Sequence, residues 1–161
     1  MSTAMPAAPT TRQLVVCSLG EEEYALPIEQ VREIVHAVTP RSVASDLPWM
    51  RGVISLRGML VPVYDLATRL GVPEADPPAP RAKIVIVEPA GELAGVLVDD
   101  VVEVLTVDDA QIEEVAPPGV DARPAAIAKL GERLVLLLDP ADLLAPVATD
   151  EVPEGAPAVV A

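Results

Sequence analysis

LPWMRGVISLRGMLVPVYDL (residues 47–66) is the stretch on which the fold depends. It contains two apolar runs, 53–56 and 59–63, on either side of the pair Arg57-Gly58. Runs this short, rich in β-branched residues and interrupted by a glycine, are typical of two buried strands joined by a tight turn. Gly58 can adopt the positive φ that such turns need. The stretch therefore predicts a β-hairpin with Arg57 at its tip.

Arg57 is the unusual residue of this hairpin. A buried and unpaired charge is costly, so its side chain should lie at an exposed tip or face a carboxylate. Glu33 lies in the same half of the chain and could pair with Arg57 or serve a separate contact. Because an exposed ion pair adds little to stability, contact with a partner is the better explanation for an arginine at this position.

The flanking segments predict more short elements. Residues 14–19 and 23–26 are expected to form strands around a turn at 20–22. Pro27 suits the first position of a short helix that carries Ile28, Val31 and Ile34 on one face, with Glu33 beside that face and a strand over 35–38. After the central hairpin, Asp65 can cap a helix through Leu70 that ends at Gly71.

The second half repeats this layout. A proline-rich spacer (72–81) precedes strands at 83–88, 93–98 and 101–105, a segment that is mostly loop (106–124), and a hairpin formed by 127–130 and 133–138. Asp139-Pro140 should then start a last short helix through Leu144. Each half therefore carries a glycine turn, an apolar strand, an aspartate cap and a short helix, which predicts two similar small β units. Residues 1–13 and 147–161 read as flexible tails.

Composition supports a mainly β chain of this kind. The 161 residues are 51% hydrophobic and contain no Phe, one Trp and two Tyr, so Val, Leu, Ile and Ala must build the core. The 18 prolines and 9 glycines supply frequent breaks, which suits many short strands. A single cysteine fits a reducing compartment, and the longest strongly apolar run, 134–138, is too short to span a bilayer. We expect a cytoplasmic protein with no direct membrane insertion.

The formal net charge of −14 makes nucleic acid and anionic lipid poor partners. The charge is unevenly distributed, because residues 14–71 carry five basic and seven acidic side chains, whereas residues 83–146 carry four and thirteen. A partner that needs arginine contacts should therefore meet the first half.

Catalytic residues are hard to find in the sequence. His36 is the only histidine and is expected at a strand edge or surface, and Cys17 alternates within an apolar strand as a small core residue. The pairs Asp99-Asp100 and Asp108-Asp109, with Glu103, could bind a divalent metal in a small hydrolase. A solvated acidic face is the favoured interpretation, so we expect no metal, no cofactor and no catalytic site.

Five motifs in order resemble the chemotaxis coupling protein family (CheW-like). The resemblance covers roughly residues 13–146 and implies two small five-stranded β barrels, about 14–80 and 81–146, that share an apolar core. The motifs are Leu19–Ile28, Val31–Ile34, Gly52–Gly58 with Val61–Leu66, Gly95–Val104, and Leu134–Asp139 with Leu143-Leu144.

The resemblance also implies a function without catalysis. Members of this family act as adaptors that link the cytoplasmic tip of a chemoreceptor to the regulatory domain of a histidine autokinase, in arrays at the membrane. It places the kinase contact on the first barrel and the receptor contact between the barrels, without assigning single residues to either partner. A similar adaptor in another array, governing surface motility or gene expression, is the nearest alternative. By position, the residues matching family contact sites are Val31, Glu33, Ile34, Gly52 and Arg57.

Overall fold

The computed structural model describes residues 10–72, 80–89, 91–115 and 125–144 of the chain and is built mainly from β-strands. Two one-turn helices and two short 3-10 segments join them. None of the helices in these ranges is long and apolar enough to cross a membrane. The strands are β1 (Thr11–Leu19), β2 (Glu22–Pro27), β3 (Val31–His36), β4 (Met50–Leu56), β5 (Met59–Asp65), β6 (Lys83–Val87), β7 (Ala94–Val98), β8 (Asp100–Asp108), β9 (Ile112–Val115), β10 (Ala125–Leu130) and β11 (Arg133–Leu137).

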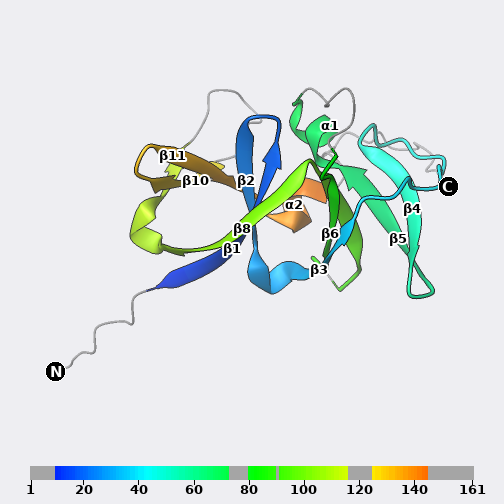
Figure 1. Cartoon of the computed structure of the whole chain (residues 1–161), viewed down its shortest axis with the longest axis horizontal. Helices are drawn as coiled ribbons and strands as arrows, with labels where there is room; N and C mark the ends of the chain where they lie inside the picture. The colour runs from blue at the N-terminus through cyan, green and yellow to red at the C-terminus, as the bar shows by residue number, and fades with distance from the viewer. Residues whose placement is uncertain (1–9, 73–79, 90, 116–124, 145–161) are drawn as a thin grey trace, which may run out of the picture.

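The strands form two sheets that lie side by side, with helix α2 (Pro140–Leu144) between them (Figure 1). The first sheet has the order β8-β1-β2-β11-β10-β9 and the second the order β3-β6-β7-β5-β4. In each sheet a hairpin strand is joined in parallel to a strand from the other half of the chain: β5 pairs with β7, and β11 with β2. The predicted mainly β fold in two subdomains is thereby confirmed.

The expected division of the chain at residue 80 is corrected by the sheet topology. The first sheet takes β1 and β2 from the first half and four strands from the second, while the other sheet takes β6 and β7 from the second half. The described sheets have six and five strands instead of five each. The two halves are joined through two parallel pairings, β2 with β11 and β5 with β7, and two antiparallel pairings, β1 with β8 and β3 with β6.

Three apolar clusters explain how the sheets hold together. One cluster is shared by both sheets and both helices. Each sheet also has one smaller cluster of its own on its other face. Strand β6 shows the arrangement, since Val85 and Val87 face the shared cluster while Ile84 and Ile86 face the second sheet's own cluster. Both faces of the strand are buried, which accounts for its continuous apolar sequence.

Both predicted aspartate caps are confirmed. Asp65 accepts hydrogen bonds from the backbone N–H groups of Ala67 and Thr68 at the start of α1 (Leu66–Leu70), and Gly71 ends that helix with φ of 75°. Asp139 accepts from the N–H of Ala141 at the start of α2. The repeated hairpin, cap and helix seen in the sequence therefore correspond to repeated structure.

The predicted helix after Pro27 is wrong beyond its first turn. Only Ile28–Gln30 is helical (η1, a 3-10 turn), and Val31–His36 is strand β3, antiparallel to β6. The register shifts between Val31 and Glu33, which marks a β-bulge at Arg32. The bulge places Val31 and Ile34 opposite Val87 and Val85, on one face, so three-residue spacing arose here in a strand instead of a helix.

Two boundaries also differ from the prediction. Strand β8 continues to Asp108, and after a 3-10 turn (η2, Asp109–Gln111) the polar segment Ile112–Val115 forms edge strand β9. Sequence reasoning missed β9 because an edge strand needs no alternating apolar face. At the N-terminus, β1 begins at Thr11, inside the segment expected to be a tail. The remainder of both expected tails, apart from Thr10, lies outside the described residues.

Candidate functional site: the β4–β5 hairpin and the adjoining edge of β3

Arg57 occupies the tip of the β4–β5 hairpin, as the sequence predicts. Its φ is 51° and that of Gly58 is 84°, so both central residues of the turn are left-handed, as in a type I′ hairpin turn. Arg57 is the one residue other than glycine with positive φ in the described part of the chain. The side chain is 71% exposed. An arginine in a position that favours Asn or Gly points to selection for something other than stability.

The guanidinium of Arg57 forms a two-pronged ion pair with Glu33. Nη1 donates to Oε1 at 2.5 Å and Nη2 to Oε2 at 2.8 Å. Strands β3 and β4 are the opposite edges of their sheet. The ion pair therefore links one edge strand, which carries Glu33, to the turn that follows the other edge strand. The sheet must curl to bring these two edges together at the ion pair.

The ion pair shifts the titration of both partners. Hydrogen bonding from Arg57, reinforced by its positive charge, holds the pKa of the Glu33 carboxyl below its usual value. The same carboxylate raises the pKa of Arg57. Both groups are thus charged at neutral pH, and the exposed side of the guanidinium remains open to a partner.

Gly52 is buried and serves the closure of the sheet instead of contacting solvent. The backbone of Arg41 exchanges two hydrogen bonds with Val53, at 2.8 and 2.9 Å. A Cβ atom on Gly52 would lie 2.1 Å from the Arg41 carbonyl oxygen, and the φ of Gly52 is +143°. Only glycine permits the chain after β3 to approach β4 this closely.

Val31 and Ile34 lie on a different face from the ion pair. Because of the bulge they share the face of β3 that is directed toward the core common to both sheets, whereas Glu33 lies on the other face. Val31 is half-buried against that core together with Ile28 of η1 and Val101 of β8. The five predicted residues therefore fall into three places: the tip with Glu33 and Arg57, the seam between the sheets with Val31 and Ile34, and the buried Gly52.

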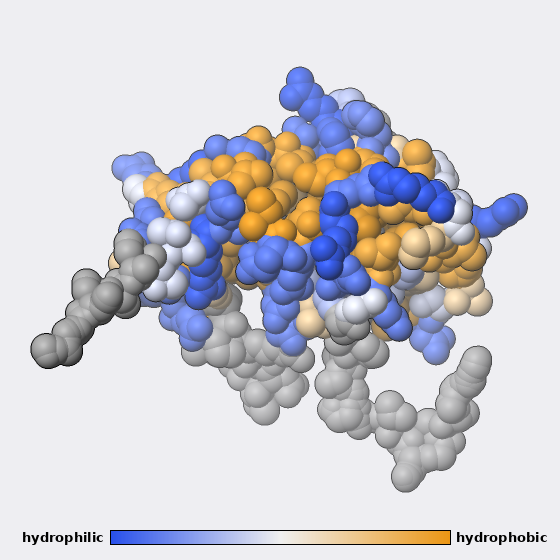
Figure 2. Space-filling view, turned by 90° about the horizontal axis from the view of Figure 1, so that it is seen from below, coloured by the Kyte–Doolittle hydropathy of each residue, from blue (hydrophilic) through white to orange (hydrophobic). Residues whose placement is uncertain are grey.

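Exposed apolar side chains that sequence reasoning missed surround these places. Met59 and Leu60 follow the turn directly, and Leu60 is 73% exposed. Val102 and Val104 are exposed on the edge strand β8. Figure 2 shows a broad apolar area on the face seen from below, interrupted by hydrophilic residues. Apolar surface of this kind on a monomer is typical of protein interfaces. The sequence signal for Met59 and Leu60 was the apolar run 59–63, which begins before burial starts at Val61.

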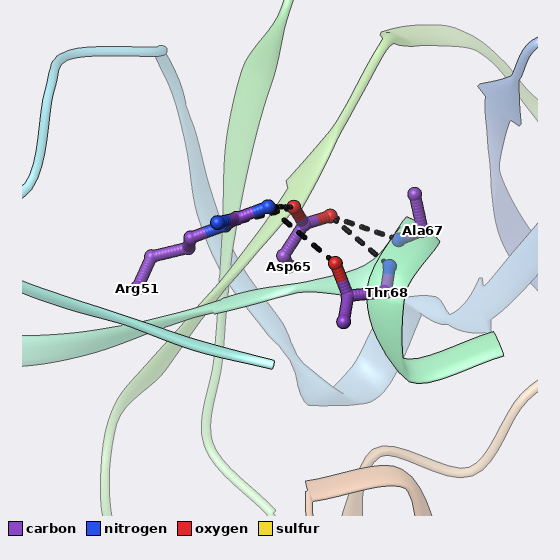
Figure 3. Close-up of polar contacts among 4 residues, drawn as sticks. All are labelled: Arg51, Asp65, Ala67 and Thr68. Carbon is purple, nitrogen blue, oxygen red and sulfur yellow. Dashed lines mark hydrogen bonds and ion pairs between the residues drawn. The ribbon is translucent and has the colours of Figure 1, made fainter. Parts of the chain in front are cut away.

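The base of the hairpin is fixed by a buried carboxylate (Figure 3). Asp65 is 4% exposed and accepts from Arg51 Nε at 2.9 Å and from its Nη2, while its other oxygen caps α1. Arg51 Nη2 also donates to the Thr68 hydroxyl at 3.4 Å. The group ties β4, β5 and α1 together at the end of the hairpin opposite Arg57.

The cysteine, aspartates and histidine considered for catalysis are buried, hydrogen-bonded to the backbone or exposed on a strand edge. Cys17 is fully buried, and burial, with the negative charge of Asp100 as a smaller cause, raises the pKa of its thiol to about 12. Asp99 accepts from the N–H of Gly20 at 2.8 Å, and Asp100 from that of Val101. His36 is exposed on edge strand β3. Within the described ranges, no group of three or more histidine, cysteine, aspartate or glutamate residues could hold a metal ion.

The sequence of residues 13–147 matches the family model of the CheW-like domain, which spans every described strand except the first two residues of β1. The chain belongs to the CheW-like family. A chemotaxis protein CheW of Bacillus subtilis is 34% identical over 134 residues, which cover 81% of this chain and 85% of the relative. A probable chemotaxis protein CheW of Rhizobium etli is 41% identical over 103 residues, 63% of this chain and 65% of the relative's length.

A solved CheW-like structure shares the fold. The crystal structure of the scaffolding protein TtCheW from Thermoanaerobacter tengcongensis has 34% sequence identity and superposes with a TM-score of 0.70. The match covers 81% of this chain and 88% of that one. The sequence resemblance to this family is confirmed by both comparisons.

Proposed function

We propose that the chain is a non-catalytic adaptor of chemotaxis signalling that links the cytoplasmic tips of chemoreceptors to a histidine autokinase. Membership of the CheW-like family supports the adaptor role, and the names of its relatives support chemotaxis. The adaptor works in the cytoplasm and is recruited to receptor arrays at the membrane.

The tip of the β4–β5 hairpin is the proposed contact for the regulatory domain of the kinase. The observation that carries this assignment is Arg57, held by Glu33 in an exposed and conformationally costly turn. Met59 and Leu60 add exposed apolar area beside it. A central arginine bordered by apolar side chains is the composition that dominates interface energetics.

The seam between the two sheets is the proposed contact for the receptor tip. Ile28, Val31 and Val101 are half-buried there against the shared core, and Ile34 extends the same face of β3. A receptor's helical tip can bind such a surface by laying an apolar stripe across it. Gly52 supports both contacts indirectly, since it allows the sheet carrying them to close.

Reconstitution with receptor-containing membranes and the kinase tests this function. The rate of kinase autophosphorylation should rise when wild-type chain is added and should remain low with kinase or receptor alone. With Arg57→Ala, the chain concentration that gives half-maximal kinase activation should rise about thirtyfold, as expected for loss of a central interface arginine. Its circular dichroism melt should match that of the wild type, because an exposed ion pair contributes little to stability.

The matched control is Lys129→Ala. Lys129 pairs with Glu113 at 2.8 Å in an exposed ion pair on the other sheet, so its removal makes the same kind of change away from the hairpin. We expect kinase activation by this variant to equal that of the wild type. Full activation by Arg57→Ala would refute the hairpin assignment, and a wild-type chain without effect on the kinase would refute the adaptor.

A further inference from the structure

We propose that the kinase's regulatory domain presents a carboxylate to Arg57, bordered by apolar side chains. This inference rests on the function proposed above and names the chemical group that the hairpin tip binds. A guanidinium has two edges that can each hold a carboxylate. The end edge is formed by Nη1 and Nη2, and the side edge by Nε and Nη2.

Glu33 occupies the end edge of Arg57. Nη1 donates to one of its carboxylate oxygens at 2.5 Å and Nη2 to the other at 2.8 Å. The side edge is open, because Nε of Arg57 donates to no acceptor in the part of the chain that the structure describes. The Arg57 side chain is 71% exposed, so a partner can reach this edge from solvent.

Arg133, the first residue of β11, shows a guanidinium of this chain with two carboxylates around it. Its side edge holds Glu23, with Nε and Nη2 at 2.7 and 3.2 Å from the two carboxylate oxygens. Nη2 also lies 2.7 Å from a carboxylate oxygen of Glu103 in β8. One arginine therefore binds two carboxylates here, and the single carboxylate on Arg57 leaves room for a second.

The side edge of Arg57 favours a carboxylate over a carbonyl oxygen. Its two parallel N–H groups match the two oxygens of a carboxylate, and such a charged pair is stronger than a bond to a neutral acceptor.

The apolar side chains beside the turn make an acceptor necessary. Met59 is 54% exposed and Leu60 73%. A partner that covers them excludes water from the tip. A guanidinium N–H that loses its water without gaining an acceptor is costly, whereas one that faces a carboxylate is compensated.

Calorimetric titration of the intact kinase with the full chain tests which group faces Arg57. Arg57→Lys keeps the positive charge but loses the forked donors, and Arg57→Gln keeps amide donors without the charge. With a carboxylate on the partner, the Kd should rise about tenfold for Arg57→Lys and about thirtyfold for Arg57→Gln. Equal Kd values for the two variants, or a larger rise for Arg57→Lys, would indicate a neutral acceptor and overturn the proposal.

Charge reversal locates the carboxylate. Arg57→Glu should raise the Kd at least about thirtyfold. Each exposed Asp and Glu of the regulatory domain is then changed to Arg, one at a time, in the intact kinase. One of these changes should improve the binding of Arg57→Glu at least about tenfold and should weaken the binding of the wild-type chain.

Lys129→Glu is the matched control, since it reverses the cation of an exposed ion pair on the other sheet. Its Kd should stay within about twofold of the wild-type value, and the kinase change that restores Arg57→Glu should not improve its binding. Weak binding of Arg57→Glu that no single kinase change restores would overturn the carboxylate and leave the hairpin contact in place. A wild-type chain that does not bind the kinase would refute the proposed function, and this inference with it.

Discussion

The position of Arg57 at a hairpin tip follows from the sequence, because the short apolar runs on both sides of Arg-Gly predict two strands with this pair in the turn. Its partner was left open, since Glu33 lies 24 residues away in the sequence and only the curling of the sheet brings the two together. Contacts made by sheet closure leave no trace in local periodicity.

A charge swap separates an internal role of Arg57 from a partner contact. Arg57→Glu alone should abolish kinase activation, and adding Glu33→Arg restores an ion pair within the chain but not the positive charge at the tip. We expect the double variant to melt like the wild type and still to fail in kinase activation. Activation restored by the double variant would show that the ion pair, and not contact of Arg57 with a partner, is what matters.

The ion pair also predicts an acid titration. The pKa of Glu33 is lowered in the folded chain, so its stabilising contribution is complete above the pKa of an unfolded glutamate and is lost as the pH falls through the lowered value. Carboxyl ¹³C NMR should show Glu33 titrating below ordinary glutamates in the wild type. In Arg57→Ala its pKa should rise toward the ordinary value, and an unchanged Glu33 pKa would contradict the pairing.

At the scale of elements, β3 is where the sequence was most misleading. Apolar residues three apart are the mark of a helix face, but the bulge at Arg32 gives Val31 and Ile34 the same spacing within a strand. The caps of α1 and α2 were predictable because each depends on a few adjacent residues. Bulges depend on the partner strand, and β6 lies some fifty residues further along the chain.

Glycine substitutions test the closure of the second sheet. Gly52→Ala should destabilise the fold by at least about 2 kcal/mol, because its Cβ would collide with the Arg41 carbonyl oxygen. Gly20→Ala is the control, since Gly20 also has positive φ but faces open space, and it should cost only about 1 kcal/mol. Chemical denaturation measures both, and equal losses would mean that the close approach of Arg41 is unimportant.

Asp65 is the second test at this scale. Asp65→Ala removes a helix cap and leaves Arg51 without its carboxylate, so we expect a loss of about 2 to 3 kcal/mol in unfolding free energy. Asp65→Asn keeps an acceptor for the α1 N–H groups and should lose roughly half as much. If both variants matched the wild type in urea denaturation, the contacts of Asp65 with Arg51 and with α1 would contribute nothing to the free energy of unfolding.

At the scale of the whole molecule, the two-part β architecture was predictable but the strand connectivity was not. The repeated hairpin, cap and helix predicted two similar units. The exchange of strands between the halves is a long-range pairing that neither half encodes alone. Without phenylalanine, the shared core is built mainly from Val, Leu and Ala side chains, with Tyr24 as its buried aromatic residue among those described. One folded unit with a shared core therefore carries both the hairpin tip and the seam between the sheets.

The central claim is that the chain bridges receptor and kinase through its two proposed contacts, and co-sedimentation tests this claim most directly. Receptor-containing membranes are mixed with the kinase and increasing amounts of chain, and the kinase recovered with the membranes is measured. We predict that kinase recovery rises with added chain and that Arg57→Ala needs about thirtyfold more chain to reach the same recovery, although that variant still sediments with the receptor. Kinase recovery that is independent of the chain would contradict the account.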